Sequence, residues 1–152
     1  MSDPLHVGFV VEGPTDRIVL EAITAHLLGG REFVAEQLSP ELSAAFGALS
    51  GGGWGTVYKW CRQAAGQSGG CLRNNPLLDR LDLLIVHVDA DVAGKAYADY
   101  AWIAASFDQP NDLPCRRPCP PASASTDPLR NVVLGWMGET LVPPKAVLCT
   151  PR

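Results

Sequence analysis

Residues 83–91, Leu-Leu-Ile-Val-His-Val-Asp-Ala-Asp, decide the fold class of this chain. The first six are apolar except for one histidine, and the segment then ends on two aspartates. A short apolar run rich in branched side chains is typical of a strand that is buried on both faces of a sheet. We therefore expect a central strand over 83–88 that presents Asp89 and Asp91 at its carboxyl end.

A second segment repeats this arrangement near the N-terminus. Residues 7–16 read Val-Gly-Phe-Val-Val-Glu-Gly-Pro-Thr-Asp, and we expect a strand over 7–11 followed by a turn at Glu12. Thr15 or Asp16 is suited to cap the helix that follows. That helix carries apolar residues at helical spacing and ends at a pair of glycines. The apolar residues are Ile18, Val19, Ala22, Ile23 and Leu27.

Strands and helices alternate along the remainder of the chain. Periodicity predicts strands over 33–38 and 145–149 and helices over 54–65, 93–107 and 129–141, but it does not decide the state of 40–49 or 77–81. The alternation predicts an α/β, Rossmann-like fold with a mostly parallel central sheet of about four or five strands and helices on both faces. Ligands bind such sheets at the carboxyl ends of the strands, where both acidic segments lie.

The composition indicates a globular protein. A chain of 152 residues with 47% hydrophobic and 18% charged residues suits one domain over 1–152. Six prolines fall within 108–128, so we expect an irregular segment there.

The net charge of −4 counts against DNA binding by charge alone, but a bound metal ion would invert the local potential.

Nothing in the sequence indicates a membrane partner. It contains neither a membrane-spanning apolar run nor the pattern of a secretory signal peptide, so we expect a cytoplasmic location. We expect the chain to be either a compact single domain or the N-terminal part of a longer protein.

Three carboxylates are expected to meet at one edge of the sheet. Side chains alternate along an extended chain, so Asp89 and Asp91 project to the same side, and Glu12 ends the other strand. Carboxylate oxygens of this kind are the ligands that Mg²⁺ prefers beside a phosphate group. If Glu12, Asp89 and Asp91 meet in space, we expect chemistry on phosphodiesters or phosphoryl groups. The alternative is that these acids only cap helices and turns.

The order strand-Glu-Gly-x-x-Asp, helix, and later strand-Asp-x-Asp resembles the topoisomerase–primase (Toprim) domain family. The resemblance covers roughly residues 7–100 and is nearest to the small Toprim nucleases and the overcoming-lysogenization-defect nucleases. It implies that Glu12 is a general acid/base or metal ligand and that Asp89 and Asp91 bind Mg²⁺ or Mn²⁺. It also implies that Gly13 lets a phosphate approach the backbone and that Asp16 is a further acidic ligand.

Two other residues lie close to these acids in the sequence. Lys95 falls one turn past Asp91, where it either meets a substrate phosphate or is a solvated lysine. His87 alternates to the same side as Asp89, so it either supports a metal ligand from behind or is a buried histidine with satisfied hydrogen bonds.

The leading hypothesis is a metal-dependent nuclease that acts on DNA or RNA. A haloacid-dehalogenase-like phosphatase, with Asp89 as nucleophile, is a second hypothesis, although it leaves Glu12 unexplained. A third is a non-catalytic module that binds metal or phosphate within a larger assembly. Besides DNA or RNA, the expected partners are further copies of the chain in a homo-oligomer, or a larger protein assembly.

Overall fold

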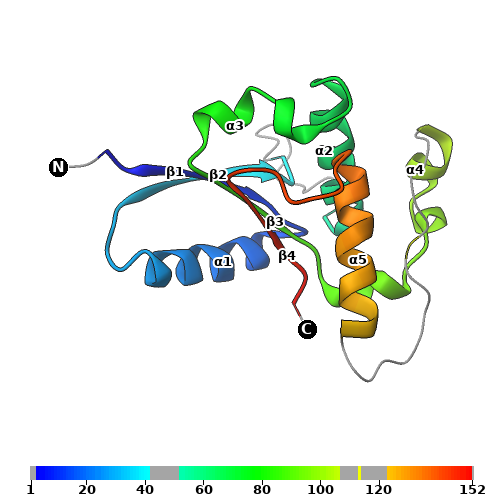
Figure 1. The fold of residues 1–152 in the computed structure, drawn as a ribbon. Helices are drawn as coiled ribbons and strands as arrows, with labels where there is room; N and C mark the ends of the chain where they lie inside the picture. Colours follow the sequence, from blue (N-terminus) through cyan, green and yellow to red (C-terminus); the bar gives the residue numbers. More distant parts are fainter. Residues whose placement is uncertain (1–2, 42–51, 107–112, 114–122, 152) are drawn as a thin grey trace.

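The computed structural model describes residues 3–41, 52–106, 113 and 123–151 (Figure 1). Four parallel strands form one sheet in the order β2-β1-β3-β4. The strands are β1 (Leu5–Val10), β2 (Phe33–Ser39), β3 (Leu83–His87) and β4 (Ala146–Cys149). The expected α/β, Rossmann-like fold is therefore confirmed, and each expected strand is found within two residues of its predicted bounds.

Two helices and the segment after β3 cover one face of the sheet. Helices α2 (Trp54–Gly66) and α5 (Ser123–Trp136) pack there on Val10, Leu84 and Val86. An aromatic group fills the space between the helices, and the indole Nε1 of Trp136 donates a 2.8 Å hydrogen bond to the hydroxyl of Tyr97. Its rings belong to Trp54, Tyr58, Tyr97 and Trp136. This buried cluster holds the segment that follows β3 against the two helices.

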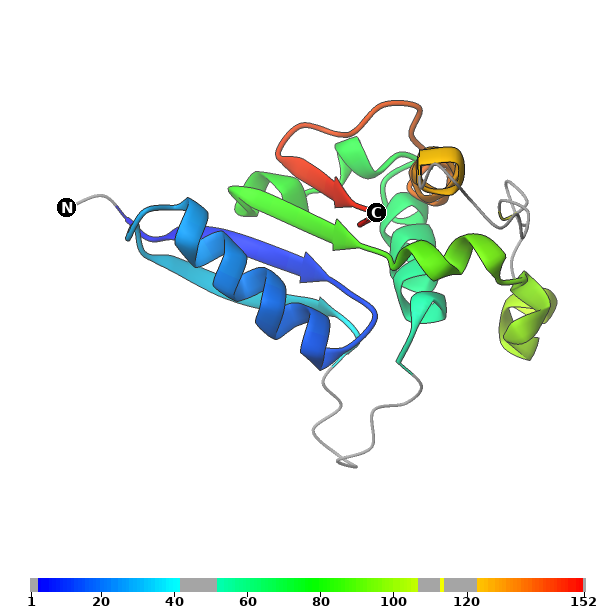
Figure 2. The ribbon, with the colours of Figure 1, turned by 90° about the horizontal axis from the view of Figure 1, so that it is seen from below.

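Helix α1 (Pro14–Leu27) lies on the opposite face, over β1 and β2 (Figure 2). Its apolar residues do not all face the sheet, since Ile18 is 68% exposed and Leu27 is 77% exposed. The helix contacts the sheet through Leu20 and buries Thr24 instead. Arg17 donates a 3.1 Å hydrogen bond to Gln37 on β2, which fixes this rotation of the helix.

The prediction of one continuous helix over 93–107 is wrong. The chain forms the 3₁₀ turns η2 (Ala90–Gly94) and η3 (Tyr97–Asp99), and then α4 (Ala101–Ser106). Extended backbone at Lys95 and Ala96 separates the two turns, and the Asp99 carboxylate accepts the Ala96 N–H at 2.9 Å. Burial of Tyr97 in the aromatic cluster favours this break over a continuous helix.

The helix expected over 129–141 is shifted toward the N-terminus. Helix α5 begins at Ser123, so residues 123–128 of the expected irregular segment are helical. It ends at Trp136 because Gly138 takes a left-handed conformation, with φ of 68°.

The two segments that periodicity left undecided have different outcomes. Residues 42–49 of the segment 40–49 lie outside the described residues, whereas 77–80 form the short helix α3 (Leu77–Arg80) after the 3₁₀ turn η1 (Leu72–Asn74).

None of the helices in the described ranges is both long enough and apolar enough to cross a membrane.

We predict that Gly138→Ala lowers the free energy of unfolding by about 2–4 kcal/mol. The added Cβ would adopt an unfavourable positive φ and overlap the carbonyl oxygen of Gly70. Gly66→Ala is the matched control: it ends α2, meets nothing within 4 Å, and should be neutral or stabilise by up to about 1 kcal/mol. Urea unfolding of both variants checks this, and equal stability of the two would contradict it.

Candidate metal centre

The site lies where the chain leaves two neighbouring strands in opposite directions. After β1 it enters α1 on one face of the sheet. After β3 it enters η2, whose Val92 and Ala93 pack into the core on the other face. Strands β1 and β3 are paired side by side, so their carboxyl ends flank a topological switch point. Parallel sheets bind ligands at such a point because the diverging connections leave a crevice.

Glu12 connects the two strand ends directly. Its Oε1 accepts a 2.7 Å hydrogen bond from the backbone N–H of Asp89. The pKa of Glu12 is raised from 4.5 to about 7, chiefly by burial. The nearby charges of Asp89, Asp91 and Asp16 also raise it, and the hydrogen bond from Asp89 lowers it. The carboxyl group therefore changes its protonation near neutral pH, and a cation bound beside it would favour the ionised form.

The first cavity, which we call the carboxylate cavity, contains most of the expected site. It has a volume of about 540 Å³, and Glu12, Asp89 and Asp91 all line it together with Lys95. The Lys95 Nζ lies 3.2 Å from Oδ2 of Asp91, so the lysine is at the site but already pairs with a carboxylate. Gly53, Trp54, Asp99 and Tyr100 complete the described lining.

Asp16 lies on the other side of Asp89, in a second cavity of about 620 Å³ that we call the histidine cavity. Asp16, His87 and Asp89 each offer one ligand atom there, and these atoms lie within 4.8 Å of one another. Arg130 of α5 also lines this cavity. The four acidic residues therefore do not form one cluster: Asp89 is shared, Asp91 faces the first cavity and Asp16 the second.

Gly13 is adjacent to Glu12 but is not among the described residues that line either cavity. It is the N-cap of α1 with φ of −160°, an extended conformation that other residues also adopt. A Cβ added there would lie 3.8 Å from an Asp16 oxygen, an ordinary contact. Neither conformation nor crowding therefore explains a glycine at this position.

Helix capping does not account for the acids. Gly13, not Glu12, is the N-cap of α1, and no side-chain hydrogen bond caps that helix. Asp89 is the N-cap of η2, and its side chain makes no capping bond either. The carboxylates of Glu12 and Asp89 are thus free of the structural role that most simply explains acids at strand ends.

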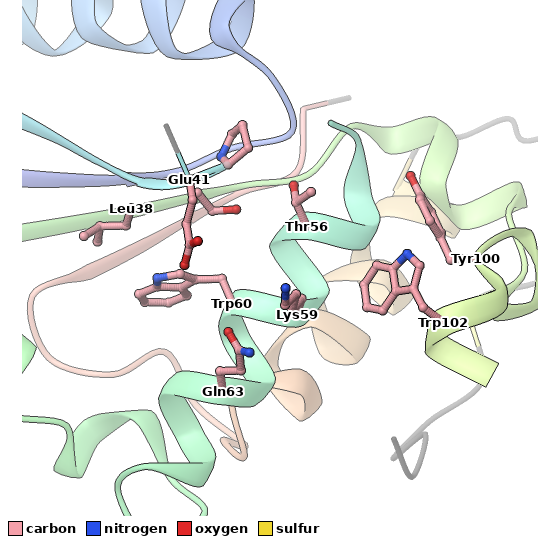
Figure 3. Close-up of a pocket in the computed structure, with 10 residues that line it drawn as sticks. Leu38, Glu41, Thr56, Lys59, Trp60, Gln63, Tyr100 and Trp102 are labelled. Atoms are coloured by element: carbon pink, nitrogen blue, oxygen red, sulfur yellow. The ribbon is translucent and has the colours of Figure 1, made fainter. Parts of the chain in front are cut away.

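A third cavity, of about 510 Å³, opens beside the carboxylate cavity (Figure 3). We call it the aromatic cavity because Trp60, Tyr100 and Trp102 line it. Figure 3 shows Lys59 between the two tryptophans in this view, with Leu38 and Glu41 toward β2. Tyr100 lines both this cavity and the carboxylate cavity, so the two are contiguous.

No pattern in the sequence pointed to Arg130 or Tyr100 as site residues. Arg130 reaches the histidine cavity because α5 passes the end of β4, where its Nη1 donates a 3.0 Å hydrogen bond to the Leu148 carbonyl. Tyr100 reaches the other two cavities because the helix expected around it is broken. Both placements depend on tertiary packing that leaves no local signal in the sequence.

The chain matches no protein-family model, and comparisons with curated proteins and with solved structures find no match either. Its function is therefore inferred from the geometry of these cavities.

We predict that Glu12→Gln reduces the pH dependence of stability when no metal is present. A folded-state pKa of about 7, above the ordinary 4.5, means that the folded protein binds the extra proton, so its stability falls as pH rises between these values. Allowing for partial solvent exposure of Glu12, the loss is roughly 1–2 kcal/mol. Glutamine still accepts the Asp89 hydrogen bond but does not titrate.

Urea unfolding in EDTA from pH 5 to pH 8 measures this difference. Glu32→Gln is the matched control, since Glu32 is exposed before β2, and it should keep the wild-type slope. Identical slopes for wild type and Glu12→Gln would show that Glu12 titrates normally.

Proposed function

We propose that the protein is a Toprim-type, metal-dependent nuclease that cleaves DNA or RNA phosphodiesters. The hydrogen bond between Glu12 and the backbone of Asp89 carries this proposal. It holds acids from two distant parts of the chain at one sheet edge, and they do not cap the helices beside them.

The oxygen donors that line the carboxylate cavity are of the type that Mg²⁺ and Mn²⁺ prefer. Glu12, Asp89 and Asp91 offer only oxygen ligands, and these ions commonly use one or two carboxylates together with a substrate phosphate. A bound divalent cation supplies the positive charge that stabilises a phosphate as its oxygens gain negative charge.

The protein residues have separate roles in this scheme. Asp89 and Asp91 hold the cation. Glu12 has a pKa of about 7 without metal, and a cation bound beside it would favour the ionised form, in which it can accept a proton. Lys95 lies at the cavity wall, where a substrate phosphate can replace Asp91 as the partner of its ammonium group.

The aromatic cavity supports a nucleic acid as the substrate. The exposed rim of Trp102 and the side chain of Trp60 provide flat surfaces on which bases stack, and Lys59 adds a positive charge beside them. Tyr100 links this cavity to the acids, so a strand lying on the aromatic rings would lead to the carboxylate cavity. Local contacts of this kind are needed because the net charge of −4 opposes binding.

We predict that Glu12→Gln and Asp89→Asn each reduce cleavage at least 100-fold while leaving the far-ultraviolet circular dichroism spectrum unchanged. Each substitution preserves side-chain volume but removes a negative charge from the proposed metal site. The assay uses labelled single-stranded DNA, duplex DNA and RNA with Mg²⁺ or Mn²⁺. The matched controls are Glu32→Gln, just before β2, and Asp79→Asn, in α3; both residues are exposed, and both variants should keep full activity.

Full activity in either site variant would reject this assignment. Hydrolysis of a small phosphomonoester without cleavage of nucleic acid would favour the phosphatase. Metal binding with no hydrolysis of any of these substrates would favour the non-catalytic module.

We predict that Trp102→Ala weakens binding of single-stranded DNA by about 5- to 100-fold, the range expected when one stacked base is lost. Trp102 is 37% exposed and contacts the ring of Tyr100 at a centroid distance of 5.6 Å. Fluorescence anisotropy with labelled DNA measures the effect, and Leu141→Ala, an exposed apolar residue before β4, is the control. Equal affinity of the two variants would exclude the aromatic cavity from the binding site.

A further inference from the structure

The histidine at the end of β3 is buried beside two carboxylates. His87 is only 8% exposed, and it lines the histidine cavity. Its Nε2 lies 3.7 Å from Oδ1 of Asp89, which is too long for a hydrogen bond. A ring nitrogen and one oxygen each from Asp16 and Asp89 lie within 4.8 Å of one another. Three ligand atoms at this spacing can converge on one ion with small side-chain adjustments.

His87 lacks the hydrogen bonds that a structural histidine would make. Its Nδ1 is buried with no hydrogen-bond partner among the described residues. Buried polar groups are normally paired, since an unpaired one costs about 1–3 kcal/mol. An apolar side chain would fit the strand without that cost, because Ile85, which precedes His87 on the same face of β3, is itself buried. The Nδ1 of His87 therefore has no partner among the described protein groups.

We propose that Asp16, His87 and Asp89 form a second metal site, selective for a transition-metal ion such as Mn²⁺ over Mg²⁺. Imidazole nitrogen binds first-row transition metals well, whereas Mg²⁺ strongly prefers oxygen. Glu12, Asp89 and Asp91 offer only oxygen, so the two sites differ in metal preference and share Asp89. This inference deepens the proposed function, on which its catalytic meaning rests.

The fold brings these three ligands together from two neighbouring strands. His87 and Asp89 project to the same side because side chains alternate in an extended chain. Asp16 lies in the first turn of α1. This helix begins just after β1, and β1 is paired with β3. Arg130 contributes a positive charge to the wall of the same cavity, where a phosphate oxygen could complete the coordination of the metal.

Pulsed electron paramagnetic resonance of the full chain loaded with MnCl₂ alone tests the proposal. Nitrogen-14 modulation of the Mn²⁺ signal reports a directly bound imidazole, whether or not the protein cleaves anything. We expect wild-type protein to show this modulation and to retain it in a tenfold excess of MgCl₂. His87→Gln should abolish it and weaken Mn²⁺ binding at one site at least tenfold, as isothermal titration calorimetry would show.

His26→Gln is the matched control, because His26 is exposed at the end of α1, and it should behave as wild type. Asp16→Asn is a second test that leaves the core around His87 unchanged, and it should also weaken the nitrogen-coordinated site. Wild-type protein without nitrogen modulation, modulation that survives in His87→Gln, or displacement of that Mn²⁺ by Mg²⁺ would each overturn the proposal.

These results separate this inference from the proposed function. Nitrogen modulation in a protein that cleaves no nucleic acid would uphold the metal site and reject the nuclease. Cleavage that depends on Glu12 and Asp89 in a protein without nitrogen modulation would uphold the nuclease and reject the metal site at His87.

Discussion

One hydrogen bond joins the acidic ends of the two central strands: the backbone N–H of Asp89 donates to the carboxylate of Glu12 at 2.7 Å. It joins the ends of two paired strands that are separated by 77 positions in the sequence. Burial, with the nearby charges of Asp89, Asp91 and Asp16, raises the pKa of Glu12 to about 7, whereas this hydrogen bond lowers it. A bound cation, as we propose, would relieve this concentration of negative charge at the sheet edge.

The fold maintains this arrangement by packing its two faces differently. Helices α2 and α5 bury one face with a dense aromatic cluster, and that cluster anchors the turns that carry Asp91 and Lys95. Helix α1 covers only part of the other face and leaves the histidine cavity between itself, the end of β4 and α5. Asp89 lies between the two cavities, so its substitution should affect both, whereas Asp91 and Asp16 each belong to one.

Sequence patterns predicted the strands that are buried because they consist mostly of apolar residues. Leu83–His87 and Leu5–Val10 are strands because each is an almost continuous apolar run, and their acids lie together because parallel strands end at one edge. The patterns failed where tertiary contacts outweigh local preference. Tyr97 is drawn into the aromatic cluster and breaks an expected helix, while Arg17 rotates α1 so that Ile18 faces outward. Sequence patterns also did not predict that the acids divide between two cavities, because spacing in the sequence does not reveal on which side of Asp89 each residue lies.

Anomalous diffraction from crystals soaked in MnCl₂ tests the central claim most directly, because it locates the cation without reference to activity. The account predicts an anomalous peak in the carboxylate cavity, about 2 Å from carboxylate oxygens of Asp89 and at least one of Glu12 and Asp91. Crystals that preserve the Glu12–Asp89 hydrogen bond but show no peak beside these residues at millimolar Mn²⁺ would contradict it.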